Sequence, residues 1–101
     1  MYQVLKRDGT TVEFELEKIS AAMIKAFEAL NKNYHPSVIN LLTLQVTSHF
    51  EKKIQDGKIA VEDIQDSVEQ VLSDAGYADV AKAYILYRKQ REKIRNVNSA
   101  L

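Results

Sequence analysis

The chain has 101 residues, of which 46% are hydrophobic and 28% charged, a composition typical of one folded domain. Its 14 basic residues balance its 14 acidic ones, so net charge indicates neither nucleic acid nor an anionic membrane as a partner. The absence of cysteine excludes a disulfide framework and a zinc ribbon within these residues. Because no apolar stretch suits a secretory signal or a membrane span, we expect a cytoplasmic protein without a membrane partner.

Residues 3–15 are predicted to form a β-hairpin. Two short segments of alternating character flank a tight turn, and an Asp-Gly pair can take positive φ at both central positions of a type I′ turn. A two-residue turn at Asp8 and Gly9 would place Val4 opposite Glu13. A longer loop would shift this register.

Four helices are predicted to follow, because hydrophobic residues then recur at helical spacing. Pro36 suits the first turn of the second helix, and Gly57 suits a left-handed cap at its end. The expected spans are about 17–31, 36–55, 61–74 and 79–96. The inner stripe expected for the second helix is Val38, Leu41, Leu42, Gln45, Val46, His49 and Phe50.

The expected fold class is therefore α+β and mostly α, with an N-terminal β-hairpin packed on a four-helix bundle. Residues 1–95 are expected to form a single domain, and residues 96–101 a tail or linker.

Catalytic residues are not evident in the sequence. The two histidines, His35 and His49, do not lie near a candidate nucleophile, and there is neither metal-ligand spacing nor a Walker-type glycine loop. We therefore expect that this chain alone is not an enzyme.

Three cations are candidates for phosphate binding. Lys6 and Arg7 lie beside the tight turn, whose amides can face an anion, and Lys18 lies at the start of a helix, where the dipole favours negative charge. Folding of the hairpin onto this helix start would create a site suited to a triphosphate. The alternative interpretation is that these three cations are ordinary surface charges surrounded by water.

Other candidates are apolar or lie on the last helix. Val4, Ile19 and Ile64 either form a flat slot for a purine ring or belong to the core. Arg88 and Arg91 share one helix face, which allows a role in ligand binding or simple complementation of the helix dipole. A basic helix that carries aromatic residues also allows nucleic-acid binding.

Three blocks of the sequence resemble the ATP-cone family and together cover about residues 3–92. The first is Val4-Leu5-Lys6-Arg7-Asp8-Gly9 followed by Phe14 and Lys18-Ile19, and the others span residues 59–69 and 80–88. ATP-cones are found at the N-terminus of many ribonucleotide reductases and in a repressor of reductase genes. The block Tyr84-Ile85-Leu86-Tyr87-Arg88 is most similar to the anaerobic, glycyl-radical (class III) ribonucleoside-triphosphate reductases.

The resemblance implies an allosteric module that binds ATP as activator and dATP as inhibitor, with Mg²⁺ as a companion ion. It would regulate a reductase catalytic domain or subunit through its assembly state, including homo-oligomers, without direct binding to nucleic acid. The alternatives are a free-standing cone, a repressor-associated cone, and a helical interaction or nucleic-acid-binding module. The repressor would carry a zinc ribbon ahead of the cone, which this sequence does not contain.

The resemblance also implies which residues contact the nucleotide. The phosphates would be held by the hairpin, the first helix and the last helix, and the base and ribose by apolar residues and Glu15. The complete predicted set is Val4, Lys6, Arg7, Gly9, Glu15, Lys18, Ile19, Val61, Ile64, Gln65, Tyr87, Arg88 and Arg91. Two positions depart from the family pattern, since Val12 replaces an acidic residue and Gln65 replaces a histidine that several relatives carry.

Overall fold

The computed structural model describes the backbone of residues 2–100 and the side chains of residues 2–93. In chain order its elements are β1 (Gln3–Leu5), β2 (Thr11–Glu13), α1 (Leu16–Ala29), α2 (Pro36–Phe50), the 3₁₀ helix η1 (Glu51–Lys53), β3 (Lys58–Ala60), α3 (Val61–Asp74) and α4 (Ala78–Ala100). The predicted class, α+β and mostly α, is confirmed. Within the described residues, no helix is both long and apolar enough to cross a membrane.

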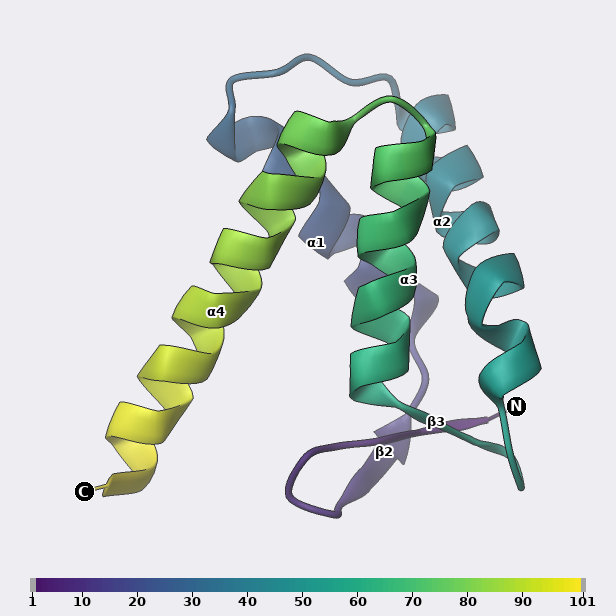
Figure 1. Cartoon of the computed structure of the whole chain (residues 1–101), viewed down its shortest axis with the longest axis vertical. Coiled ribbons are helices and arrows are strands. Elements are labelled where there is room, and N and C mark those ends of the chain that lie inside the picture. Colours follow the sequence, from purple (N-terminus) through teal and green to yellow (C-terminus); the bar gives the residue numbers. More distant parts are fainter. Residues whose placement is uncertain (1, 101) are drawn as a thin grey trace.

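The helices form a ring of neighbours around one core. Helix α1 packs against α2 and α4, and α3 packs against the same two helices. In Figure 1, α3 stands between α2 and α4, α1 lies behind them, and the small sheet crosses the lower end. The largest fully buried apolar side chains come from all four α-helices and from β3; they are Met23, Phe27, Val46, Phe50, Ile59, Val68, Leu72 and Val80. Burial of side chains of this size stabilises the fold by about 1.5–3 kcal/mol each.

The sheet contains three strands in the order β2-β1-β3, one more than the hairpin predicted. Strand β3 pairs parallel to β1, with Val4 opposite Ile59 and Leu5 opposite Ala60. A strand of three residues has too few positions for its alternation to be recognised in the sequence. Its pairing places the start of α3 beside the end of β1.

The hairpin turn differs from the predicted two-residue type I′ turn. Gly9 has φ +88°, whereas Asp8 does not have a positive φ, and its carboxylate instead accepts hydrogen bonds from the Thr10 amide and hydroxyl at 3.0 and 2.6 Å. The Lys6 amide donates to the Thr10 carbonyl at 2.8 Å, which closes a loop longer than two residues. Val4 therefore lies opposite Val12 rather than Glu13.

The predicted and observed helix boundaries agree best for α3, whose predicted span of 61–74 is confirmed.

Helix α2 ends at Phe50, earlier than predicted, and the stripe of residues that it buries is rotated relative to the predicted one. Leu41 is 55% exposed, and Thr43 is buried although it is polar. Thr43 can occupy the core because its hydroxyl donates to the Ile39 carbonyl at 2.7 Å. Ile39, Leu42, Val46 and Phe50 recur at helical spacing as well, so periodicity alone did not decide which stripe of α2 faces the core.

The predicted inner stripe of α2 also included Gln45 and His49, which are exposed. His49 nevertheless has a polar partner, because its Nδ1 lies 2.8 Å from the hydroxyl of buried Ser67. His35 is exposed and accepts a hydrogen bond from the Ser37 amide at 3.1 Å at the start of α2.

Gly57 belongs to a β-turn rather than to a helix cap. Asp56 and Gly57 have φ +53° and +72°, the two positive values that a type I′ turn requires. Gln55 and Lys58 exchange both backbone hydrogen bonds across this turn, each at 2.9 Å. The turn leads directly into β3.

Helix α4 extends to Ala100, beyond the predicted end near Asn96. The backbone of the predicted tail, residues 96–101, is thus helical as far as Ala100, and Leu101 lies outside the described residues.

We expect Gly57→Val to lower the free energy of unfolding by about 1–2 kcal/mol, because a β-branched residue disfavours positive φ. Gly57→Asn is the matched control, since asparagine tolerates this conformation. A Cβ at this position meets no atom within 4 Å, so neither variant creates a clash. Urea unfolding measures both variants; equal stability of Gly57→Val and wild type would contradict the assigned turn.

Candidate functional site

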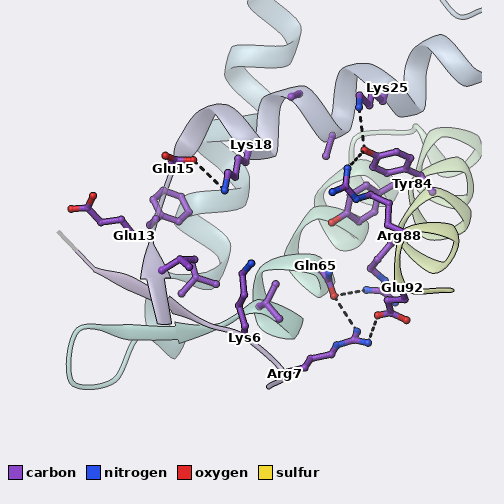
Figure 2. Close-up of a pocket in the computed structure, with 18 of the residues that line it drawn as sticks. Lys6, Arg7, Glu13, Glu15, Lys18, Lys25, Gln65, Tyr84, Arg88 and Glu92 are labelled. Carbon is purple, nitrogen blue, oxygen red and sulfur yellow. Dashed lines mark hydrogen bonds and ion pairs between the residues drawn. The ribbon is translucent and has the colours of Figure 1, made fainter. Parts of the chain in front are cut away.

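A cavity of about 810 Å³ opens between the hairpin, the starts of α1 and α3, and the middle of α4. Its size lies within the range of small-molecule sites. Figure 2 shows side chains from these elements pointing toward a common space. The lining residues are Val4, Lys6, Arg7, Asp8, Val12, Glu13, Phe14, Glu15, Lys18, Ala21, Ala22, Lys25, Val61, Gln65, Tyr84, Tyr87, Arg88, Arg91 and Glu92.

Most of the predicted site residues line this cavity. They are Val4, Lys6, Arg7, Glu15, Lys18, Val61, Gln65, Tyr87, Arg88 and Arg91. Gly9 does not line it, and its positive φ serves the hairpin turn. Ile19 and Ile64 are only 6% and 8% exposed and belong to the core, because they lie on the inward stripes of α1 and α3. Neither isoleucine lines the cavity, so their part in a slot for a purine ring stays a prediction.

A different apolar surface forms the cavity floor. Val4 and Val12 are cross-strand partners that both line the cavity, and Val61 and Phe14 extend this surface on either side. Phe14 is held in place by aromatic packing, since its ring centroid lies 4.7 Å from that of Tyr2. The floor depends on the observed hairpin register, because the predicted one would have paired Val4 with Glu13.

The cavity walls carry an excess of positive charge. Six lining side chains are basic and four are acidic, which leaves a net charge of +2. The starts of α1 and α3 also border the cavity, and neither helix has a side-chain cap on its first amides. Uncapped amides and the helix dipole both favour an anion at these positions.

Lys6 and Lys18 are the cations most available to a ligand. Within residues 2–93, no ion pair or side-chain hydrogen bond involves Lys6, whose ammonium points into the cavity (Figure 2). Lys18 lies 3.3 Å from Glu15, but the two side chains are 72% and 54% exposed. A solvent-exposed pair of this kind contributes about 0–1 kcal/mol and is easily exchanged for another partner.

Arg7 is more constrained than the sequence suggested. Its Nε donates to Glu62 at 3.0 Å, and its terminal nitrogens form an ion pair with Glu92 and reach Gln65 at 3.5 Å. Arg7 thus joins the hairpin to both α3 and α4, as the dashed lines in Figure 2 show. Arg88 pairs with Glu69 at 2.8 Å, and its buried Nε has no hydrogen-bond partner among the described side chains.

Lys25 is the cavity cation that the sequence prediction missed. Its ammonium lies 3.3 Å from the Tyr87 hydroxyl, which also accepts from Arg91 at 3.1 Å. These hydrogen bonds, first from Arg91 and then from Lys25, lower the pKa of Tyr87. Helical spacing could have identified the residue, because Lys18, Ala22 and Lys25 follow one another on one face of α1.

Comparison with known proteins matches residues 2–93 to the ATP cone domain. Similar proteins include a ribonucleoside-diphosphate reductase subunit alpha of Chlamydia muridarum, 41% identical over 101 residues, covering 92% of this chain and 10% of that protein. A vitamin B12-dependent ribonucleoside-diphosphate reductase of Mycobacterium tuberculosis is 35% identical over 99 residues, covering 98% of this chain and 14% of that protein. An anaerobic ribonucleoside-triphosphate reductase of Haemophilus influenzae is 35% identical over 100 residues, with coverage of 99% and 14%.

The chain therefore belongs to the ATP-cone family, as the three sequence blocks predicted. It spans only 10–14% of the length of these relatives, which are named as three kinds of reductase.

Tyr84 provides a test of the cavity wall that does not depend on a ligand. It is 6% exposed, and burial raises its pKa to about 12. A raised folded-state pKa means that its contribution to stability is complete below about pH 10, the unfolded value, and falls as pH rises toward 12. We expect Tyr84→Phe to reduce the loss of unfolding free energy between pH 9 and 12, by roughly 2–3 kcal/mol at most. Urea unfolding at several pH values measures this, and identical pH profiles for variant and wild type would contradict the burial of the hydroxyl.

Proposed function

We propose that the cavity binds ATP and dATP and that its occupancy regulates a ribonucleotide reductase catalytic domain or subunit. The observation that carries this proposal is Lys6, which has no side-chain partner among residues 2–93 and shares an apolar-floored cavity with Lys18 and with Arg88 of α4. An adenine nucleotide needs both features, a flat apolar surface for its base and several cations for its phosphates. Membership of the ATP-cone family supports the same ligand.

The chemistry of the lining residues suggests an orientation for the nucleotide. The purine would lie on the floor formed by Val4, Val12 and Val61, where Glu15 can accept a hydrogen bond from the base or ribose. The phosphates would lie toward Lys6 and the cations of α1 and α4. Val12 cannot supply the acidic contact that several family members have, so the nearby carboxylates of Glu13 and Glu15 would replace it.

Mg²⁺ would enter with the phosphates rather than occupy a site built by the protein. In the part of the chain that the structure describes, no three histidine or acidic side chains converge to hold a metal ion. Mg²⁺ commonly takes one or two protein carboxylates together with phosphate oxygens and water. Asp8, Glu13 and Glu15 line the cavity and are the available carboxylates on the hairpin side.

The regulatory output would be a change in how the reductase assembles, including the formation of homo-oligomers. The alternative function, nucleic-acid binding through the basic end of α4, has less support because Arg88 and Arg91 line the cavity. Calorimetric titration with ATP and dATP separates the two functions. Saturable binding of either nucleotide supports the proposal, and its absence would favour the alternative.

Lys6→Ala and Lys18→Ala are each expected to weaken ATP binding by about ten- to a hundredfold. The reason is the loss of a charge-assisted contact to phosphate, which costs about 1.5–3 kcal/mol. Among residues 2–93, Lys6 has no side-chain partner and Lys18 forms only an exposed ion pair, so stability should change by less than about 0.5 kcal/mol. Isothermal titration calorimetry and urea unfolding measure the two effects.

Lys93→Ala is the control, since Lys93 is exposed and does not line the cavity. It should change neither binding nor stability. If Lys6→Ala and Lys18→Ala remain folded and bind ATP as the wild type does, the phosphates lie elsewhere.

ATP and dATP are expected to differ in affinity by no more than roughly tenfold. They differ by one 2′-hydroxyl, whose hydrogen bond in a solvent-accessible site contributes about 1 kcal/mol. Neither nucleotide should be hydrolysed, because in the part of the chain that the structure describes no histidine lines the cavity to act as a general base. Competition titrations and a phosphate-release assay check these expectations; a difference of several hundredfold, or phosphate release well above buffer, would contradict them.

A further inference from the structure

The outer face of α2 carries no charged side chain. The 15 residues of this helix include no aspartate, glutamate, lysine or arginine, although 28% of the whole chain is charged. Six residues are exposed on the side opposite the buried stripe; they are Ser37, Asn40, Leu41, Leu44, Gln45 and Ser48. We call this surface the α2 face. Depletion of charge is characteristic of the central part of protein–protein interfaces.

Two leucines distinguish the α2 face from other exposed parts of the protein. Leu41 and Leu44 are 55% and 61% exposed and lie three residues apart, on the same side of the helix. Leu86 of α4 is similarly exposed, at 62%, but Lys82 and Lys89 lie one turn before and after it. A partner that covered Leu86 would therefore also have to accommodate two cations. The α2 face has no such requirement.

Helix α2 takes no part in the cavity. In the part of the chain that the structure describes, no residue of α2 lines the cavity, and the helix packs against α1 and α3. Figure 1 shows α2 on the side of α3 away from α4, which forms a cavity wall. The α2 face is thus available to a partner whether or not the cavity is occupied.

The order of residues on the α2 face is nearly the same in both directions along the helix. It reads Ser, Asn, Leu, Leu, Gln, Ser, with spacings that are symmetric about the midpoint between Leu41 and Leu44. A two-fold axis through this midpoint, perpendicular to α2, would bring two copies of the helix together antiparallel. The pairs across the axis would be Leu41 with Leu44, Asn40 with Gln45, and Ser37 with Ser48. Each pair is chemically matched, because leucines pack together and both amides and hydroxyls donate and accept hydrogen bonds.

We propose that the α2 face is a homodimer contact, in which two copies of this chain pack antiparallel about a two-fold axis between Leu41 and Leu44. An interface of this kind places one patch against itself, so the patch has to complement itself. The α2 face does so, whereas a face with charges would bring like charges together across the axis. This inference rests on the proposed function only through the homo-oligomers invoked there, for which it names a surface.

The dimer is expected to be weak because the α2 face is small. A helix of 15 residues is about 22 Å long and about 10 Å wide, well below the roughly 800 Å² that each partner contributes to a standard interface. We therefore expect a dissociation constant of about 100 µM to 1 mM.

Sedimentation velocity of the 101-residue chain without nucleotide, from about 20 µM to 1 mM, tests the contact. The wild type should sediment as a monomer at the low end and increasingly as a dimer at the high end. Leu41→Glu and Leu44→Glu should each weaken the dimer by about tenfold or more, because each would bury a carboxylate without a partner. Both positions are exposed and glutamate favours helices, so the thermal midpoints should be unchanged. Leu86→Glu is the matched control and should dimerise as the wild type does.

Cross-linking tests the antiparallel register. The chain has no cysteine, so Ser37→Cys and Ser48→Cys each provide a single thiol. On oxidation, a mixture of the two variants should form a disulfide-linked dimer, whereas each variant alone should not. Within either variant, the two copies of the thiol would lie eleven residues apart along antiparallel helices, which is roughly 16 Å and too far for a disulfide.

Three results would overturn the proposed dimer. They are a wild-type chain that stays monomeric at all these concentrations, cross-linking of either cysteine variant with itself, and a dimer that Leu86→Glu abolishes while Leu41→Glu preserves it. No nucleotide enters these measurements, so their failure would leave nucleotide binding in place. Conversely, a chain that dimerises through α2 but binds neither ATP nor dATP would overturn the proposed nucleotide site alone.

Discussion

The parallel pairing of β1 with β3 is the constraint on which the candidate site depends. Leu5 lies opposite Ala60, and α3 begins at the next residue, so the chain leaves β1 beside the first turn of α3. Lys6 and Arg7 follow immediately and therefore face a helix start. A hairpin alone would be marginally stable in water, whereas β3 joins this one to the core through Ile59, which is 1% exposed. The same pairing thus stabilises the floor of the cavity and positions its cations.

Local sequence predicted the helical part of the fold well, and the family motif predicted most of the cavity lining. The span of α3 and the cations Lys6 and Lys18 follow from periodicity and from a compact motif. Strand β3 could not be recognised in this way, because its partner lies 55 positions away, as the pairing of Val4 with Ile59 shows. Lys25 was missed for a related reason, since the apolar stripe of α1 indicates which face enters the core but not which face meets α4.

The two Asp-Gly pairs show why turn type could not be read from a dipeptide. Asp56 and Gly57 adopt the type I′ conformation that was predicted for Asp8 and Gly9. At the second position, pairing of β3 with β1 favours a tight turn that sends the chain straight into the strand. At the first position, Thr10 offers both an amide and a hydroxyl to the Asp8 carboxylate, which stabilises a longer loop. The choice between them comes from interactions that lie outside the dipeptide.

The elements that form the cavity walls are joined partly by apolar packing and partly by exposed ion pairs. The ion pairs are the weaker of the two, so a bound ligand would alter them first. The four helices share a closely packed apolar core, whereas the ion pairs that join the hairpin to α3 and α4 run through Arg7, whose side chain is 48% exposed. Exposed ion pairs of this kind contribute about 0–1 kcal/mol each, less than the roughly 1.5–3 kcal/mol of a charge-assisted contact to phosphate. A polyanion in the cavity can therefore compete with Glu92 for Arg7 at low cost, while the core stays intact. The contact between the hairpin and α4 is thus the part of the structure that a bound nucleotide would alter most easily.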